Sequence, residues 1–376
     1  MRKKILAMLL CVTTVLSFCA CGNNGSNDGT EQGSENAKVD PPTIESLAEF
    51  DNIKEILTGD YEITDDVIEL EFKNMLYSAG GGLADLGDKP AEKGDIVEVD
   101  FQGYYKDGKT MGDSAKGVGA LIDIDENASI NSSTGATAGG YIEGFSKGLF
   151  GAKAGDKLGY DVTFPDPYTP NEDLSGETVT FKFEVKKVYE PITPDNITDE
   201  RVAKYLEKTY GLTTVDGFMK YVEEEMAYRA VMAYVTTKSK VTIPTNYTDY
   251  RVDLYADFYQ EFYCGENELE DVLKNYYNMT LSEARTQWAQ SLKSNITYET
   301  VFAEMIKSKN IKTDESALKA YVDDVLKINS TFKDADSIYK FAGVGDVEAG
   351  KEYLLNELAL RDYILSAYRA TKAETK

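Results

Sequence analysis

The pattern of apolar and polar positions changes twice along the chain. Before Gly80, apolar residues recur at helical spacing over 44–48, 53–57 and 64–77. Thr64 precedes two acidic residues, which is typical of a helix start, and three consecutive glycines at 80–82 end the pattern. The N-terminal region is therefore predicted to form two short helices and one longer helix.

Between about residues 94 and 190 the apolar period changes to two. Alternating stretches at 96–101, 121–124 and 179–185 are separated by turn residues such as Gly, Pro and Asp. This pattern predicts a small antiparallel sheet, with one short helix near 145–149. After Pro194 the pattern is helical to the end of the chain, apart from a short extended stretch at Val241–Ile243.

The sequence therefore predicts an α+β fold. The sheet domain is inserted between an N-terminal helical arm and an all-α C-terminal region. The helices of this region are expected to start at Thr198–Glu200 and at Thr214, to run through 254–262, and to centre on 269–276, 281–302, 315–328 and 353–368.

The first 20 residues have the pattern of a secretory signal peptide. A basic start, Arg2–Lys4, is followed by an uncharged apolar run, Ile5–Phe18. Ala20 and Cys21 then resemble a bacterial lipobox, in which cleavage after Ala20 leaves Cys21 as a lipidated N-terminus. The alternative is an ordinary signal peptide cut nearby. Residues 21–42 are polar and Gly-rich, which predicts a flexible tether.

Charge and composition exclude several classes of function. Lys and Arg number 40 against 65 Asp and Glu, and removal of residues 1–20 makes the net charge −28. Such a chain is repelled by phosphate, so no nucleic-acid partner is expected. The chain has no histidine, which excludes Ser–His triads and His-ligated metals. Of the four cysteines only Cys264 lies beyond the lipobox, and we expect it to be buried. The acidic run 223–225 favours a solvated helix face over a metal site, and no metal or cofactor is expected.

Short motifs in a fixed order occur in the middle of the chain. They are Gly94–Val97, Asp100–Gly103, Ile142–Phe145, Val162–Tyr168 and Leu174–Glu177, followed by Phe181–Val185. This ordered set resembles an FKBP-type peptidyl-prolyl isomerase of the branch found inside trigger factor. The resemblance implies an FKBP-like half-barrel over residues 88–190.

The resemblance extends beyond the sheet domain. Residues 43–87 look like the arm of trigger factor, and 191–376 look like its helical substrate-holding domain. The signal peptide and tether stand where that family has its ribosome-docking domain. The resemblance therefore implies a protein that does not bind ribosomes and is lipid-anchored through Cys21 on the extracytoplasmic face of the cell membrane. Its expected partners are unfolded or proline-containing exported polypeptides.

Isomerisation of an X–Pro bond requires no proton transfer, metal or cofactor. Its barrier of about 18–20 kcal/mol comes from amide resonance, and the uncatalysed reaction takes tens of seconds or longer. An apolar pocket can lower this barrier, because water stabilises the polar planar amide more than the twisted state. A thousandfold acceleration requires only about 4 kcal/mol of transition-state preference. The absence of histidine is thus compatible with this activity.

The resemblance also implies which residues form the pocket. They are Phe101, Met111, Asp113, Tyr141, Ile142, Phe145, Tyr168 and Phe181, with Leu121 or its neighbour Ala120 as a further wall. Phe145 would be the floor, and the Ile142 N–H would bind the substrate carbonyl. Met111 and Tyr141 depart from the usual residues at their positions, and residues 126–140 form a longer and more polar segment than the turn of the family. These aromatic residues could instead be no more than the core of the half-barrel.

The C-terminal region is rich in tyrosine, with 18 of the 26 tyrosines from Tyr205 onward. Tyr250 and Phe258 lie in a segment crowded with rings, which is either an exposed surface that holds unfolded clients or helix core. Three functions remain open. The first is an isomerase that also holds clients, the second is a catalytically weak or inactive client-binding module, and the third is a partner-binding lipoprotein.

Overall fold

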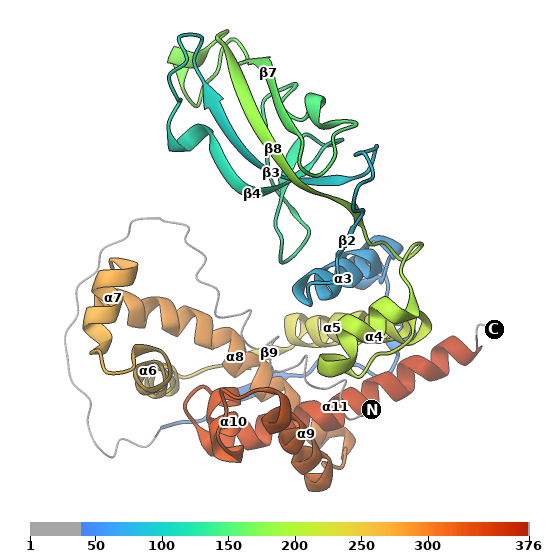
Figure 1. Ribbon diagram of the computed structural model, residues 1–376. Coiled ribbons are helices and arrows are strands. Elements are labelled where there is room, and N and C mark those ends of the chain that lie inside the picture. Colours follow the sequence, from blue (N-terminus) through green and yellow to red (C-terminus); the bar gives the residue numbers. More distant parts are fainter. Residues whose placement is uncertain (1–38, 375–376) are drawn as a thin grey trace. The chain divides into compact units, whose positions relative to one another are not determined.

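The computed structural model describes residues 39–374, which form two compact units (Figure 1). One unit contains 65–207 and 212–222, and the other contains the described residues up to Thr64 together with 208–211 and 223–374. The predicted signal peptide, Cys21 and most of the predicted tether lie outside the described residues. The α+β fold class is confirmed, with an antiparallel sheet between N-terminal helices and a helical C-terminal region. Within residues 39–374, no helix combines the length and the apolar character that crossing a bilayer requires.

The first unit is built on a seven-stranded antiparallel sheet. Its strand order is β2-β8-β3-β4-β5-β6 (Figure 1). In addition, β7 pairs with the first half of β8, residues 178–184, whereas β2 pairs with its last three residues. The strands are β2 (Leu83–Asp85), β3 (Ile96–Tyr104), β4 (Lys116–Asp123), β5 (Ala128–Ile130), β6 (Thr137–Gly140), β7 (Lys157–Thr163) and β8 (Thr178–Pro191). The polar segment 126–140 is thus an ordered hairpin, because β5 continues the sheet from β4 and turns back as β6.

The period of two in the sequence explains the central strand. Val179, Phe181, Phe183 and Val185 on β8 are buried, and the residues between them are not. A β-bulge follows, because Val99 of β3 pairs with Val185 whereas Glu98 pairs with Lys187. Lys186 is therefore an extra residue in β8, and it shifts the alternation by one position. As a result the next side chain that points into the core is Val188, which is fully buried. The sheet thereby places a continuous row of apolar side chains on one face.

Three helical segments complete this unit. They are α3 (Asp65–Ser78), most of α4 (Asp199–Tyr210) and the first two turns of α5 (Val215–Lys238). Phe72 of α3 stacks on Phe218 of α5 with ring centroids 4.9 Å apart. The Arg201 guanidinium donates to the carbonyl oxygens of Gly81 and Leu83, at 2.9 and 3.1 Å. The glycine-rich segment that ends α3 is therefore fixed to α4.

The second unit is mainly helical. It contains β1 (Thr43–Ser46), α2 (Ile53–Ile56), β9 (Lys240–Thr242), α6 (Thr245–Tyr259), a π-helical turn (Gln260–Cys264), α7 (Leu269–Tyr277), α8 (Leu281–Lys309), α9 (Glu315–Ile328), α10 (Ala335–Ala342) and α11 (Val347–Glu374). Thr280 and Glu283 form a capping box at the start of α8. Asn278 and Asn310 end α7 and α8 in the left-handed conformation. The helices predicted after Pro194 are all present, although their bounds differ from the prediction and α10 was not predicted.

The start of the described chain differs from its prediction. Residues 44–48 were expected to be helical, but Thr43–Ser46 is the strand β1, which pairs antiparallel with β9. The helix predicted over 53–57 is confirmed as α2. Ile53 and Ile56 pack with Val231 of α5 and with residues of α8 and α11 in one buried cluster. Residues 43–64 therefore belong to the helical unit, while the remainder of the predicted arm belongs to the unit with the sheet.

The acidic run 223–225 is not a solvated face, so that expectation is wrong. Glu224 and Glu225 are buried, and all three carboxylates pair with cations of α11. Lys372 pairs with Glu223, and Arg369 pairs with Glu224 through two hydrogen bonds of 2.8 Å. Arg361 pairs with Glu225. The charges join α5 to α11 because the face that was expected to contact water is covered by another helix.

One buried carboxyl group on α11 has an incomplete set of partners. Glu357 is 6% exposed, and its Oε2 makes no hydrogen bond with any residue that the structure describes. Burial raises the pKa of Glu357 to about 7, and the neighbouring Tyr228 hydroxyl and Arg361 offset this rise only in part. Below about pH 7 the native state therefore favours the protonated form of Glu357.

We predict that Glu357→Gln changes how stability depends on pH. An ordinary Glu has a pKa of about 4.3 when unfolded. Because the folded pKa is higher, native Glu357 retains its proton between about pH 4.3 and 7, and the stability of the unaltered protein falls across that window. The variant lacks this loss, so its free energy of unfolding relative to the unaltered protein should rise with pH, by about 4 kcal/mol in total, and level off above about pH 7.5.

The measurement is urea unfolding followed by the fluorescence of Trp288, the only tryptophan of the chain. Trp288 is buried in the helical unit, so it reports on the unit that contains Glu357. Glu348→Gln, an exposed change on the same helix, is the control. A stability difference that does not vary between pH 5 and 8 would contradict the shifted pKa.

Candidate functional site

Phe145 lies at the centre of a ring cluster on the apolar face of the sheet. Its ring centroid is 4.9 Å from that of Phe181 and 5.0 Å from that of Phe101, and both pairs are edge-to-face. Phe183 of β8 adds a third edge contact at 5.2 Å. Phe145 is 1% exposed and Phe181 is 4% exposed, whereas Phe101 is half-buried. The structure therefore brings together the residues predicted as floor and walls.

A tight turn fixes the position of Phe145. The Phe145 N–H donates to the Ile142 carbonyl oxygen at 3.1 Å, which closes a β-turn over 142–145. Gly144 occupies its third position with φ of 84°, a conformation that a type II turn requires and that glycine adopts without strain. The Tyr160 hydroxyl of β7 donates to the Phe145 carbonyl oxygen at 2.6 Å. The turn is thus held by the strand beneath it.

Asn127 was not predicted as a site residue, although it makes most of the polar contacts of this turn. Its Nδ2 donates to the carbonyl oxygens of Tyr141 and Ile142 at 3.0 and 2.9 Å, and its Oδ1 accepts from the Ser146 N–H at 2.9 Å. Its own carbonyl oxygen accepts from the Tyr141 N–H at 2.8 Å. Asn127 is in the left-handed conformation (φ 50°), which asparagine tolerates better than most residues. One side chain therefore positions the whole segment.

The Ile142 N–H remains available to a ligand. The carbonyl oxygens of Tyr141, Ile142 and Phe145 all accept hydrogen bonds, but no atom of the described chain accepts one from the Ile142 N–H. Ile142 is half-buried and packs against the ring cluster. The donor that the sequence assigned to the substrate carbonyl is thus present and unoccupied.

Two glycines allow the walls of the cluster to approach the sheet. A Cβ at Gly117 would lie 2.3 Å from the ring of Phe101, so only glycine admits that ring. A Cβ at Gly103 would lie 3.0 Å from both the Met111 Sδ and the Phe181 ring. Met111 therefore packs beside Phe181 at the edge of the cluster, where it is half-buried.

Tyr141 covers the floor of the cluster. Its ring stacks on Phe145 with centroids 4.1 Å apart and planes 14° apart, and it also contacts Phe101 edge-on at 6.0 Å. Tyr141 itself is half-buried. Burial raises the pKa of Tyr141, and it likewise raises the pKa of Tyr160, so both hydroxyls are neutral near pH 7. The ring cluster is therefore apolar and uncharged.

Three predicted site residues lie apart from these rings. Leu121 points to the other face of β4 from Ala120 and Ile122, and it is Ala120 that packs against the cluster. Asp113 is exposed at the start of a short 3-10 helix. The ring of Tyr168 packs at the edge of the core and contacts Phe164 at 4.9 Å. Of the two candidates for the further wall, the geometry selects Ala120.

The two predicted client-binding residues of the helical unit differ in exposure. Tyr250 of α6 is 38% exposed, whereas Phe258 is 1% exposed and stacks within a core of α6, α7 and α8. Phe258 is therefore helix core, and the expectation of an exposed ring surface fails for it. The exposed rings nearby are Tyr263, Tyr276 and Tyr277. Cys264 is buried, as expected.

Comparison with known proteins agrees with the geometry of the sheet domain. Residues 87–186 match the family model for the FKBP-type peptidyl-prolyl cis-trans isomerase. The trigger factor of Marinobacter nauticus is 25% identical over 369 residues, which cover 90% of this chain and 76% of that protein. The trigger factor of Clostridioides difficile is 26% identical over 336 residues, covering 84% and 74%. The trigger factor of Listeria monocytogenes is 24% identical over 302 residues, covering 75% and 66%.

The sheet domain is thus FKBP-like over residues 87–186. The chain as a whole is trigger factor-like, and it spans about two thirds to three quarters of the length of these relatives. A solved structure titled for promiscuous substrate recognition by the trigger factor chaperone aligns with 87% of this chain and 78% of its own. Its sequence identity is 15% and its TM-score is 0.28, so that likeness carries no argument about the arrangement of the units.

We predict that Tyr160→Phe loosens the turn without removing any ring. The substitution deletes only the hydroxyl that donates to the Phe145 carbonyl, and a lost buried hydrogen bond costs about 1 kcal/mol. Hydrogen–deuterium exchange of the full chain should show about fivefold faster exchange at 142–149. Tyr104→Phe on β3 is the control, because no partner within residues 39–374 bonds to that hydroxyl. Equal exchange in both variants would show that Tyr160 does not position Phe145.

Proposed function

We propose that the protein is a peptidyl-prolyl cis-trans isomerase that also holds unfolded polypeptides. The single observation that carries the isomerase assignment is the free Ile142 N–H at the edge of an apolar ring cluster. The match of residues 87–186 to the FKBP-type isomerase family and the likeness to trigger factors support it. None of these observations requires a metal or a cofactor.

The chemistry follows from the polarity of the amide. Resonance makes the planar X–Pro amide polar, and water stabilises this form more than the twisted transition state. Transfer of the bond to the apolar cluster of Phe101, Phe145 and Phe181 removes that stabilisation of the ground state. The Ile142 N–H fixes the carbonyl that precedes the rotating bond. Catalysis then requires positioning and desolvation alone.

Tyr141 limits how readily a proline ring reaches Phe145. The Tyr141 ring occupies the face of Phe145, so a substrate ring has to displace it. An aromatic pair of this kind is worth about 0.5–1.5 kcal/mol beyond its buried area. Since 1.4 kcal/mol is a factor of ten in rate, this displacement lowers the activity by up to about tenfold. The same contact favours the second function, a weak isomerase that mainly binds clients.

We predict that Tyr141→Val increases the isomerase activity. Valine leaves the face of Phe145 open, so kcat/KM should rise by about fivefold to tenfold. The measurement is the refolding rate of a test protein whose slow phase is limited by a trans-to-cis proline isomerisation, with and without the full chain. No increase would show that Tyr141 does not compete with the substrate ring. If neither the unaltered chain nor Tyr141→Val accelerates refolding, the client-binding alternative holds.

We predict that Phe145→Leu and Phe181→Leu each lower the activity by about tenfold. Leucine maintains an apolar interior but removes the ring that contacts the substrate proline. Phe150→Leu is the matched control, because Phe150 follows the same segment and is 45% exposed. Circular dichroism should establish that all three variants retain the fold. An unchanged refolding rate in both ring variants would remove the isomerase assignment from this site.

The holding activity is proposed for the helical unit. Tyr250, Tyr263, Tyr276 and Tyr277 expose 38–78% of their surface, and tyrosine can face either water or an apolar chain. The net charge of −25 favours clients that are neutral or basic. The likeness of the chain to trigger factors over most of its length supports this part of the proposal.

We further propose that the protein acts on the extracytoplasmic face of the cell membrane, anchored by lipid on Cys21, and does not bind ribosomes. The basic start, the apolar run and the Ala20–Cys21 pair support this location. A tether of about 20 residues would then allow the folded units to reach clients up to about 70 Å from the anchor. Clients would be exported polypeptides that refold after translocation.

We predict that Cys21→Ser abolishes lipidation. In a bacterial host that processes lipoproteins, the unaltered chain should incorporate an alkyne-labelled palmitate and partition into detergent, and the variant should do neither. Cys19→Ser lies two residues away and should be labelled like the unaltered chain. Labelling of the Cys21→Ser variant would refute an anchor at this position, and the absence of label in every form would favour an ordinary signal peptide.

A further inference from the structure

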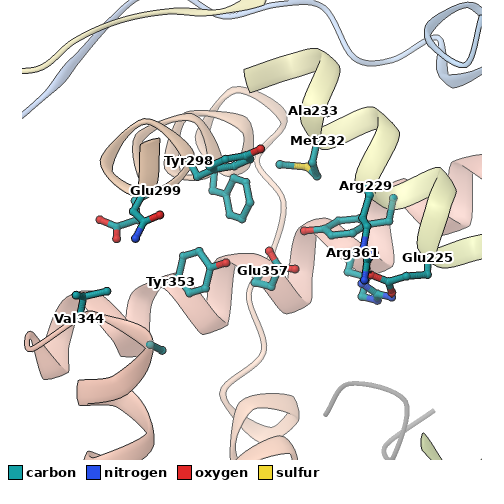
Figure 2. Close-up of a pocket in the computed structure, with 14 residues that line it drawn as sticks. Glu225, Arg229, Met232, Ala233, Tyr298, Glu299, Val344, Tyr353, Glu357 and Arg361 are labelled. Atoms are coloured by element: carbon teal, nitrogen blue, oxygen red, sulfur yellow. Dashed lines mark hydrogen bonds and ion pairs between the residues drawn. The ribbon is translucent and has the colours of Figure 1, made fainter. Parts of the chain in front are cut away.

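The helical unit contains a cavity that none of the proposals above uses. It has a volume of about 360 Å³ and lies among α5, α8 and α11 (Figure 2). Its apolar wall is formed by four rings and a methionine, namely Tyr228, Met232, Tyr298, Phe302 and Tyr353. This volume is at the lower end of the range for cavities that bind small ligands.

The acidic residues of the cavity differ in their partners. Glu225 pairs with Arg361 and, at 2.9 Å, with Arg229. Glu299 accepts two hydrogen bonds from Arg251, at 2.6 and 3.0 Å. Glu357 is the exception, because its Oε2 is buried without a hydrogen bond to any residue of the described chain. Figure 2 shows Glu357 on α11 between Tyr353 and Arg361, on the side that faces Met232 of α5.

A second polar atom of the same cavity is also left without a partner. The Tyr228 hydroxyl, on α5, is buried and close enough to Glu357 to lower the pKa of that carboxyl group, but it makes no hydrogen bond of full geometry within residues 39–374. Both oxygens can accept, and each such buried group costs free energy until a donor reaches it. The cavity thus combines two acceptors, one of them a carboxylate, with a wall of aromatic rings.

We propose that this cavity binds a primary ammonium group carried on an apolar stem. The ammonium group has three donors, so it can bond to the Glu357 carboxylate and the Tyr228 hydroxyl together. The rings of Tyr298, Phe302 and Tyr353 contact the stem, and an aromatic face attracts a cation. A lysine side chain of a polypeptide and a small organic amine share this chemistry.

Other ligand classes fit the cavity less well. A carboxylate ligand would be repelled by ionised Glu357 and would offer no donor to either oxygen. An alcohol has a single donor, so it satisfies only one of the two acceptors. The arginines of the cavity replace the ligand only in part. Arg361 and Arg229 pair with Glu225, and Arg251 pairs with Glu299. Arg361 also lowers the pKa of Glu357, but not enough to offset the effect of burial.

The affinity should depend on pH through Glu357. The groups that face it are Tyr228 and Glu225 of α5, Glu299 of α8, Tyr321 of α9, and Tyr353 and Arg361 of α11. Burial raises the pKa of Glu357 to about 7, and it also raises the pKa of Tyr228 and Tyr321, which therefore remain neutral. An alkylammonium remains charged up to about pH 10. The affinity for the amine should thus weaken about tenfold between pH 8 and pH 6, because Glu357 gains its proton.

The test compares three probes of similar size on the full mature chain by titration calorimetry. They are 2-phenylethylamine, 2-phenylethanol and 3-phenylpropionate. We expect the amine to bind at least tenfold more tightly than the alcohol at pH 8, and the carboxylate not to bind. Equal affinities for amine and alcohol, or an amine affinity that does not change between pH 6 and 8, would overturn the proposal. These measurements use the unaltered protein and do not depend on the folding of a variant.

A variant pair assigns the binding to the carboxyl group. Glu357→Gln preserves the shape of the side chain and should weaken the amine about tenfold and abolish the pH dependence. Glu348→Gln, exposed on the same helix, should leave both unchanged. An unaltered amine affinity in Glu357→Gln would place the amine elsewhere and refute the site. Since Phe145→Leu leaves this cavity intact, amine binding is tested independently of the isomerase activity.

A peptide pair distinguishes the two sources of the ammonium group. The peptide acetyl-Gly-Lys-Phe-Gly-amide is compared with the same peptide containing norleucine in place of lysine. Tighter binding of the lysine peptide than of 2-phenylethylamine identifies a polypeptide ligand. Tighter binding of the free amine than of either peptide identifies a small organic amine. Glu357→Gln should abolish the preference for lysine over norleucine in the peptide arm.

Discussion

The hydrogen bonds around the 142–145 turn are the constraint on which the candidate active site depends. Donors from the Asn127 side chain, the Tyr160 hydroxyl and the turn itself occupy the carbonyl oxygens of residues 141, 142 and 145. With those acceptors occupied, the turn cannot rotate to give the Ile142 N–H a partner from its own chain. The same bonds hold the ring of Phe145 at the centre of the cluster. The free donor and the apolar floor therefore have one structural cause.

A different physical device holds the helical unit together. Its α5 and α11 are joined by buried or half-buried ion pairs at Glu223, Glu224 and Glu225. Removal of one partner of a buried pair is costly, because an uncompensated charge remains, whereas the intact pair adds little net stability. Such pairs thus specify the register of two long helices more than they stabilise them. The apolar contacts of Ile53, Ile56 and their cluster supply the attraction.

The sequence predicted the rings of the site and the Ile142 donor, and it missed the polar side chains that hold the turn. Phe101, Phe145 and Phe181 were expected together from family motifs in a fixed order. Asn127 and Tyr160 carry no such signal, since their partners are backbone carbonyls 14 to 15 residues away. The choice between Leu121 and Ala120 depends on the register of β3 and β4, which shifts between Val99 and Phe101. No local pattern contains that shift.

The helical region shows the same limit of local patterns. The start and type of most helices follow from spacing and caps, but spacing does not say which face another helix will cover. Phe258 and the run 223–225 are buried for this reason. The strand β1 was missed because it pairs with β9, almost 200 residues later in the chain. A five-residue apolar pattern fits a helix and a strand alike until its partner is known.

The Ile142 N–H and the Glu357 carboxyl group differ in what they require of a ligand. The Ile142 N–H is neutral and half-buried, so water can satisfy it at little cost, and a substrate carbonyl gains only a modest advantage by replacing that water. The Glu357 carboxyl group is buried, and above its raised pKa of about 7 it is charged, so that an unpaired ion there costs far more than an unpaired amide. The first group suits a transient catalytic contact that must release its product. The second favours an occupant that remains bound, because Tyr228 and Arg361 offset only part of the effect of burial on Glu357.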